Sequence, residues 1–318
     1  FMTWVSSDNP RTRYKHLLQQ YEVDLDRVPE QTLDMVYYPT NKIRVPVNRE
    51  NVLRSGVVKP EDADLIVDYI DIDLPKSGLY KNRLMMLDIL HNNDWERPIY
   101  FTGGSYDDQE YIWMKDYLQL DGLVYKLVPI KTPENPINPY QMGRIDADKM
   151  YDIVKKWDWG NADSDQVYHD PETRKNSISF RSNLTRLAEQ LTKENKSEKA
   201  IAILDLTMEK MPFEYFGYYS LLTPIVAAYY QANANEKAGA LAEQIANKYG
   251  DKLHYYNSIG DANQRAYAEI ILTDMERYRA VVDATVAAEH FAIAKGLIQG
   301  FIESSRTFAP LYSAYDYY

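Results

Sequence analysis

The second half of the chain repeats a pattern of apolar, small and helix-ending residues at an interval of 38 residues. The first copy of the pattern consists of Leu184, Leu187, Ala188, Leu191, Ala200, Leu204 and Pro212. The second copy consists of Leu222, Ile225, Val226, Tyr229, Ala238, Ala242 and Gly250. Apolar residues three and four positions apart lie on one face of a helix, so each copy predicts two helices packed as a hairpin. We therefore expect an all-α domain of helical hairpins over residues 177–310.

The first half of the chain has a different texture, in which short strand-like runs alternate with helical ones. Strands are predicted at 42–47, 65–74, 98–102 and 123–130, and helices at 81–91 and 107–120. Pro46 restricts the first strand to the edge of a sheet, because proline has no N–H to donate to a central ladder. Alternating strands and helices predict an α/β domain over residues 1–131. The fold class expected for the whole chain is α+β.

Three prolines within seven residues separate the two predicted domains: Pro133, Pro136 and Pro139. A polar, Asp-rich run follows around residues 161–165. This composition is typical of a linker, so we expect a linker over residues 132–176, interrupted by a short helix at 147–157. Residues 311–318 are expected to form a tail.

The offsets within each repeat resemble those of tetratricopeptide helix pairs, whose usual period is about 34 residues. The four additional residues are expected in the connection at 213–217. The alternative is generic helical packing, because the second copy has Val226 where the family usually has a small residue. Two further helices are predicted over 255–308, but the repeat does not align them.

If the hairpins stack as tetratricopeptides do, the first helix of each pair lines a concave surface. The residues predicted to face it are Thr185, Glu189, Thr223, Tyr230 and Gln231. Such a surface receives an extended peptide or a partner helix. The alternative is that too few repeats are present and that the first domain covers this face.

Composition excludes several classes of function. The formal net charge is −11, and an acidic chain lacks the basic surface that contacts with nucleic-acid phosphates require. The chain has no cysteine, which excludes thiol catalysis and thiolate zinc sites. The longest strongly apolar stretches are about half of the ~20 residues that a membrane-spanning helix needs. We therefore expect no nucleic-acid partner and no membrane span within these residues.

A second resemblance covers most of residues 10–250 and lies in three phrases of the first half. They are YPTNK at 38–42, NNDWERPIYF at 92–101 and DGLVYKLVPI at 121–130. Together they are similar to a family of bacterial multi-spanning membrane proteins, related to protein O-mannosyltransferases, that carry a soluble region after their membrane helices. The resemblance implies that this chain is that soluble region, located on the periplasmic side of the inner membrane and tethered by spans upstream of Phe1.

The same resemblance implies a parent protein that transfers a lipid-linked sugar, with its catalytic carboxylate in a loop between early membrane helices. No catalytic residue carries over to this chain. The implied partners are the parent's own membrane domain and a protein or peptide acceptor. The expected role is non-catalytic: to position that acceptor or to mediate assembly. The alternative is a free-standing scaffold that binds a partner protein and has no connection with sugar transfer.

Other candidate sites are weak in the sequence. Asp71 and Asp73, with Asp68 nearby, form a carboxylate pair suited to a cation or to acid–base chemistry, but alternating Asp residues are more often the solvated face of a strand. The five histidines have no metal-ligand spacing. The Gly103-Gly104 turn lacks the glycine fingerprint of a phosphate site and is followed by two aspartates. We predict no catalytic, cofactor-binding or metal-binding residues and no cofactor.

Tyrosine is unusually abundant, with 28 residues against 8 Phe and 5 Trp. A tyrosine ring has an apolar face and a polar tip, which suits surfaces that are partly wet. One interpretation is a surface for a glycan, a peptide or a membrane domain. The other is that the rings fill seams between helices while their hydroxyls reach polar partners.

Overall fold

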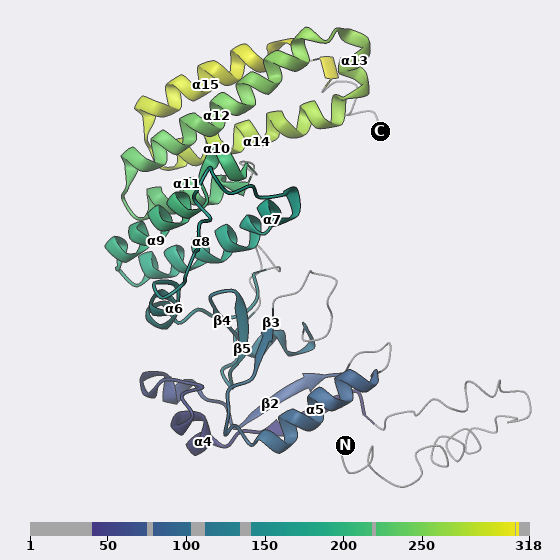
Figure 1. The fold of residues 1–318 in the computed structure, drawn as a ribbon, viewed down its shortest axis with the longest axis vertical. Helices are drawn as coiled ribbons and strands as arrows, with labels where there is room; N and C mark the ends of the chain where they lie inside the picture. Colours follow the sequence, from purple (N-terminus) through teal and green to yellow (C-terminus); the bar gives the residue numbers. More distant parts are fainter. Residues whose placement is uncertain are drawn as a thin grey trace, which may run out of the picture. The chain divides into compact units, whose positions relative to one another are not determined.

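The computed structural model describes residues 40–74, 79–102, 112–133, 141–217, 221–308 and 310–311. The chain divides into two compact units, with the boundary between residues 144 and 145. The turn at residues 121–123 belongs to the second unit. Strands occur in the first half and helices dominate the second (Figure 1), which confirms the α+β class.

The first unit contains a two-stranded antiparallel ribbon of β1 (Lys42–Pro46) and β2 (Tyr69–Asp73). Their register pairs Ile43 with Ile72 and Val45 with Ile70. Ile70 and Ile72 are buried, whereas the residues between and beside them are exposed. The alternation of buried and exposed residues predicted for this strand is therefore confirmed, and β1 with its Pro46 is an edge strand.

Three helical segments accompany this ribbon: α4 (Arg49–Arg54), the 3₁₀ helix η2 (Pro60–Leu65) and α5 (Lys81–Asn93). Asn48 caps α4, because its side-chain oxygen accepts a hydrogen bond from the Asn51 N–H at 3.1 Å. Leu87 and Leu90 of α5 pack into the core with the two isoleucines of β2. Trp95, two residues after the end of α5, belongs to the same core, and its Nε1 donates to the Pro46 carbonyl at 2.9 Å. A buried indole N–H needs such a partner.

A second, three-stranded sheet has the order β3-β5-β4, with β3 at Tyr100–Thr102, β4 at Leu118–Asp121 and β5 at Val124–Leu127. Strands β3 and β5 are antiparallel. The helix predicted at 107–120 is wrong for its described part. Residues 112–117 form the 3₁₀ helix η3, and residues 118–121 form β4. The strand predicted at 123–130 is shorter and ends at Leu127.

The physical reason for this correction lies in the turn between β4 and β5. Asp121-Gly122 is a strong hairpin signal, and Gly122 has a φ of +76°, which side chains disfavour. A Cβ on Gly122 would come within 2.7 Å of the Trp157 ring. All four residues of β4 are buried, and successive strand residues point to opposite faces, so burial on both faces of β4 outweighs the helical pattern of the sequence.

The regular elements described in the second unit are helices, apart from the end of β4 at Asp121 (Figure 1). Its helices are α6 (Ala147–Val154), α7 (Pro171–Lys175), α8 (Ser177–Lys193), α9 (Ser197–Lys210), α10 (Phe213–Phe216), α11 (Thr223–Gln231), α12 (Asn235–Ser258), α13 (Asp261–Ala266), α14 (Ala268–Ala287), α15 (Phe291–Ser305) and η5 (Arg306–Phe308). Both predicted hairpins are present as α8–α9 and α11–α12, and the short α10 occupies the predicted connection at 213–217. The residues predicted as a linker contain α6 and α7.

The described hairpins of the second unit have the same type of turn. Asn195, Asn233 and Glu289 each follow the end of a helix in the left-handed conformation, with φ of 60°, 65° and 57°. In each turn this residue's N–H bonds to a carbonyl three residues back, and the next N–H bonds to a carbonyl five residues back. These are the bonds of a Schellman helix end. The third hairpin, α14–α15, is therefore a structural equivalent of the first two.

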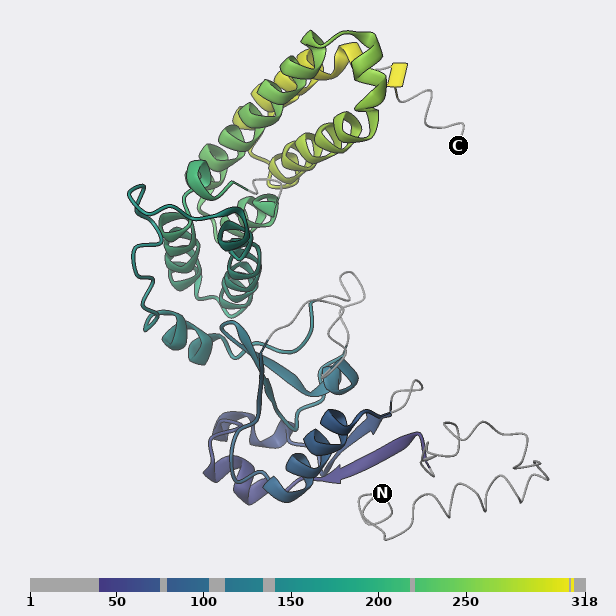
Figure 2. The same ribbon diagram turned by 45° about the vertical axis from the view of Figure 1, so that its right-hand side comes forward.

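This equivalence supplies the alignment that the sequence lacks. Ala200, Ala238 and Ala294 all lie five residues after the left-handed residue, and each is buried. A small side chain at this position lets the second helix of each pair approach the first. The third hairpin follows the second after 56 residues rather than 38, because α12 is long and α13 is inserted (Figure 2).

Among the described residues, no helix is long and apolar enough to cross a bilayer.

Candidate functional site

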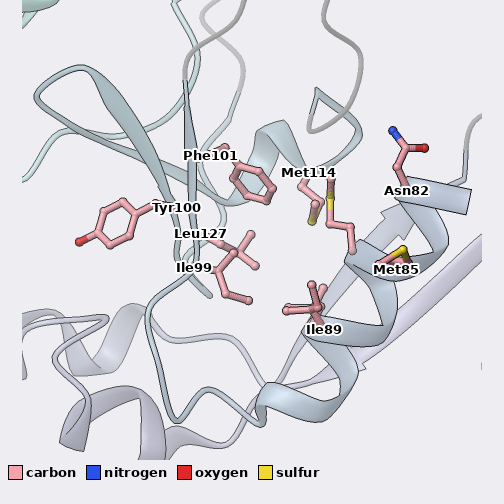
Figure 3. A pocket seen from close by; sticks show the side chains of 10 residues that line it. Asn82, Met85, Ile89, Ile99, Tyr100, Phe101, Met114 and Leu127 are labelled. Carbon is pink, nitrogen blue, oxygen red and sulfur yellow. The ribbon is translucent and has the colours of Figure 1, made fainter.

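An apolar pocket of about 400 Å³ lies between helix α5 and the β3 region of the first unit. Most of its described lining comes from α5 and from residues 99–101 at β3, with single residues of η3 and β5: Asn82, Met85, Met86, Ile89, Leu90, Ile99, Tyr100, Phe101, Met114 and Leu127. Ile89 points from α5 toward Ile99 across the pocket (Figure 3). Tyr100 points away from the pocket, with its hydroxyl outermost.

Helix α5 forms one wall because it is apolar on two sides. Leu87 and Leu90 face the core and are buried. Met85 and Ile89, one helical turn apart, remain 57% and 59% exposed. The sequence predicts Met85 and Ile89 as a broadening of the core stripe, but the structure places them at the mouth of the pocket. The sequence signal for these exposed residues is that the apolar residues of α5 cover more of the helix surface than one packed face requires.

The described lining of the pocket is mostly apolar. Among the described residues that line it none is charged, and Asn82 and Tyr100 are the polar ones. Three of the lining residues are methionines, whose flexible thioether side chains adapt to differently shaped apolar partners. The arrangement suits an apolar side chain or a short apolar segment.

The carboxylate pair of the sequence lies on the exposed face of the β1–β2 ribbon. Arg44 holds Asp71 through two bonds, Nε to Oδ1 at 2.7 Å and Nη2 to Oδ2 at 3.1 Å. Lys42 lies 3.2 Å from Asp73. These are cross-strand pairs of the register, and the hydrogen bond from Arg44 lowers the pKa of Asp71. Asp68 is also exposed. The three carboxylates thus form the solvated face of an amphipathic strand.

The histidines are scattered over the two units. His91 and His254 are exposed. The His169 ring packs against Tyr215, and His290 Nδ1 lies 3.1 Å from the Tyr230 hydroxyl. His16 and the Gly103-Gly104 turn lie outside the described residues. Within those that the structure describes, no group of three or more His, Cys, Asp or Glu residues is arranged to hold a metal ion.

The residues of the predicted peptide groove have unequal exposure. Thr185 is buried, and its hydroxyl donates to the Arg181 carbonyl at 2.6 Å. Tyr230 is also buried, against His290 of the third hairpin. Glu189 and Thr223 are half-buried, and Gln231 is exposed. Burial raises the pKa of Glu189. Helices α8 and α11 pack against each other, but whether a groove forms on them stays a prediction.

Several tyrosines of the second unit fill seams between helices. The Tyr229 hydroxyl donates to Asp205 at 3.0 Å, and burial raises its pKa. Tyr249 of α12 stacks on Tyr278 of α14 with ring centroids 6.3 Å apart. Tyr255, by contrast, is 63% exposed. Both interpretations of the tyrosine excess therefore apply, to different residues.

Comparison with known proteins gives one match. Residues 1–149 match the family described as TMEM260-associated domain 2. The matched segment includes the apolar pocket. No curated protein and no solved structure matches the chain.

Proposed function

We propose that this chain is a non-catalytic module that docks against a membrane-embedded protein, with the pocket between α5 and β3 as the contact. The observation that carries the proposal is a pocket whose described lining is apolar and uncharged, within the segment that matches the TMEM260-associated domain. The description of that family names an association with a TMEM260 protein, and the resemblance to O-mannosyltransferase relatives points to the same class of partner.

The pocket has the size and chemistry for one apolar segment of such a partner. A volume of about 400 Å³ accommodates two or three large apolar side chains, each of which contributes about 1.5–3 kcal/mol when fully buried. Met85 and Ile89 are exposed at its mouth, so contact with a partner would remove them from water. Large exposed apolar residues that surround a pocket are typical of interaction sites.

The proposal extends to the role of the whole protein. The module would position a protein acceptor, or stabilise the assembly, beside the active centre of a glycosyltransferase-like parent. It would lie on the periplasmic side of the bacterial inner membrane. These parts of the proposal rest on the resemblance of the three sequence phrases.

Site-directed cross-linking in the complete parent protein tests the docking site. The described chain has no cysteine, so Ile89→Cys introduces a unique attachment point for a photoreactive maleimide in this region. We expect residue 89 to cross-link to an apolar segment of the membrane domain, identified by mass spectrometry. Asp88→Cys is the matched control, because Asp88 is the preceding residue of α5, is exposed and does not line the pocket.

Two outcomes would contradict docking of the pocket against a membrane-embedded protein. One is equal cross-linking from positions 88 and 89, which would show that the pocket has no special role. The other is a complete gene that encodes no apolar span of about 20 residues. Turnover of a polyprenyl-linked mannose by this chain alone would overturn the non-catalytic role.

A specific observation also favours the alternative, a tetratricopeptide-like scaffold. The three hairpins share their turn and a buried alanine five residues later, as expected for stacked repeats. The part of the predicted groove that remains open to a peptide would consist of Glu189, Thr223 and Gln231. A complete gene without membrane spans, together with peptide binding that Gln231→Ala weakens, would support the scaffold over the docking module.

A further inference from the structure

A tight turn joins the two walls of the apolar pocket. Helix α5 forms one wall and ends at Asn93, and the lining of the other wall begins at Ile99. The Glu96 N–H donates to the Asn93 carbonyl at 2.8 Å, so Asp94 and Trp95 are the central residues of a β-turn. The conformation of this turn sets the direction in which the chain leaves α5 for the second wall.

Both central residues of the turn have a positive φ, 41° for Asp94 and 62° for Trp95. Positive φ at both positions is the pattern of a type I′ turn, which ordinarily has Asn-Gly or Asp-Gly there. Asp94 fits this preference, but tryptophan stands where glycine is usual. A bulky residue with positive φ is a genuine outlier, and such strain persists only where the surrounding structure imposes it.

Bonds from α4 and β1 impose the conformation of the turn. The Asn51 amide of α4 donates to the Asp94 carbonyl at 2.9 Å and to its carboxylate Oδ2 at 3.0 Å. Asn48 donates to the same carboxylate oxygen at 2.7 Å, and the Ser55 hydroxyl donates to the Trp95 carbonyl at 3.1 Å. Trp95 is 3% exposed, and its indole N–H bonds to the end of β1. The left-handed turn is therefore held from outside the turn itself.

We propose that the left-handed turn at Asp94 and Trp95 positions the two walls of the pocket, with Asn51 as the residue that holds it. Strand β3 pairs with β5, so the turn fixes how the end of α5 meets this sheet. Turns with negative φ at the central positions twist the chain the other way, and Ile99 would then not face Ile89. This inference deepens the proposed docking role, on which its consequence for partner binding rests.

Paramagnetic relaxation enhancement in the 318-residue chain measures the spacing of the two walls. The chain has no cysteine, so Asp88→Cys carries a single nitroxide on an exposed position of α5 that does not line the pocket. The nitroxide broadens the methyl signals of Ile99 on the opposite wall, by an amount that falls steeply with distance. We expect one well-defined enhancement at Ile99 in the chain with the native turn.

Replacements at position 94 test whether the left-handed conformation sets this spacing. Asp94→Val disfavours positive φ, so the enhancement at Ile99 should change at least about 2-fold. Asp94→Gly keeps the left-handed conformation accessible and should retain the original enhancement, as should the conservative variant Asp94→Asn. Glu96→Val is the matched control, because Glu96 is exposed and has no positive φ, and it should leave the enhancement unchanged.

A second set of variants separates positioning from a general loss of stability. Leu74→Ala truncates a side chain of the same core, so it should lower the unfolding midpoint and leave the enhancement at Ile99 unchanged. Asn51→Ala removes both bonds to Asp94 and should shift the enhancement in the same direction as Asp94→Val, which it replaces if that variant does not fold. Equal enhancement in Asn51→Ala and the native turn overturns the proposal. So does an equal change in Leu74→Ala or in Asp94→Gly.

The docking role is measured separately, by cross-linking from Ile89→Cys in the complete parent protein. We expect Asp94→Val to reduce this cross-link and Asp94→Gly to retain it. Loss of the cross-link even with the native turn would contradict docking, whereas the relaxation measurements would still support the positioning of the walls. A cross-link that Asp94→Val leaves unchanged overturns the positioning role of the turn.

Discussion

Asp148 of α6 forms hydrogen-bonded ion pairs with the first hairpin, α8–α9. Its two carboxylate oxygens accept hydrogen bonds from Lys196 at 2.6 Å and Lys199 at 2.8 Å. Lys196 lies in the turn between α8 and α9, and Lys199 lies in the first turns of α9. These bonds, that from Lys196 first, lower the pKa of Asp148 to about 2 from an ordinary value of 3.8. The folded state therefore favours the charged form of the Asp148 carboxylate.

The depressed pKa has a direct consequence for stability against pH. The contribution of Asp148 is fully present above its ordinary pKa and is lost as the pH falls toward about 2. Because the carboxylate is about half exposed, solvent screens the pair, and Asp148→Asn should cost roughly 0.5–1 kcal/mol at pH 7. The difference between wild type and variant should narrow between pH 4 and pH 2, measured by urea unfolding at a series of pH values. These limits follow from the ordinary and lowered pKa values.

Asp152→Asn is the matched control for this prediction. Asp152 lies one turn further along α6, is exposed and has no ion-pair partner among the residues that the structure describes. Its replacement should change stability by less than about 0.5 kcal/mol at either pH. A cost for Asp148→Asn that persists unchanged at pH 2 would show that its bonds to the lysines are not its source.

At the scale of the element, the three Schellman turns set how each hairpin closes. Asparagine occupies the left-handed position in the first two turns, as its short polar side chain favours. Glu289 occupies it in the third, with a φ of 57°. A left-handed residue other than glycine or asparagine costs roughly 1–2 kcal/mol. The third turn is therefore strained where the first two are not.

Replacing this glutamate should stabilise the protein. Glu289→Asn is expected to raise the free energy of unfolding by about 0.5–1 kcal/mol, measured by urea denaturation of the second unit's helices. The same replacement in a helix interior, Glu276→Asn, is the control and should be slightly destabilising, by a few tenths of a kcal/mol. Equal effects at the two positions would show that the left-handed conformation of Glu289 carries no strain.

At the scale of the whole molecule, the two units have separate hydrophobic cores. Ile70 is fully buried in the first core and Leu187 in the second. Separate cores are the mark of units that fold as separate domains. We therefore expect the chain to unfold in two transitions rather than one.

Core truncations identify which transition belongs to which unit. Ile70→Ala and Leu187→Ala should each lower the stability of its own unit by about 2–5 kcal/mol and leave the other transition in place, observed by differential scanning calorimetry. Leu65→Ala is the control, because Leu65 is 53% exposed and its truncation should move neither transition appreciably. A single transition that both core variants shift would show that the units unfold as one.

Much of the fold followed from patterns in the sequence, and little of the candidate site did. The alternation around Ile70 and Ile72 predicted β2, and the 38-residue interval predicted α8–α9 and α11–α12. The pocket could not be predicted, because α5 forms one wall and the β3 region forms the other. How these walls approach each other depends on the packing of Leu87 and Leu90 into the core. Met85 and Ile89 are equally apolar, and only packing decides that they remain exposed.

The burial of Arg181 likewise could not be predicted from the sequence. It is almost fully buried in α8, where its guanidinium donates to the Gly217 carbonyl at 2.7 Å and to the Met211 carbonyl at 2.9 Å. Burial lowers its pKa to about 10. Its sequence neighbours give no sign of this role, since both acceptors lie about 30 residues or more away. An arginine in a helix ordinarily extends into solvent.

The sequence by itself determined which segments are helices and strands wherever a short-range period was strong, because such periods depend on residues within a few positions of one another. It also determined where the hairpins allow close packing, through Ala200 and Ala238. The tertiary structure alone decided that residues 118–121 join a sheet, that α14–α15 repeats the earlier hairpins after a longer interval, and which apolar side chains of α5 remain exposed. These outcomes depend on partners that folding brings from distant parts of the chain, and burial energy there exceeds the local preference.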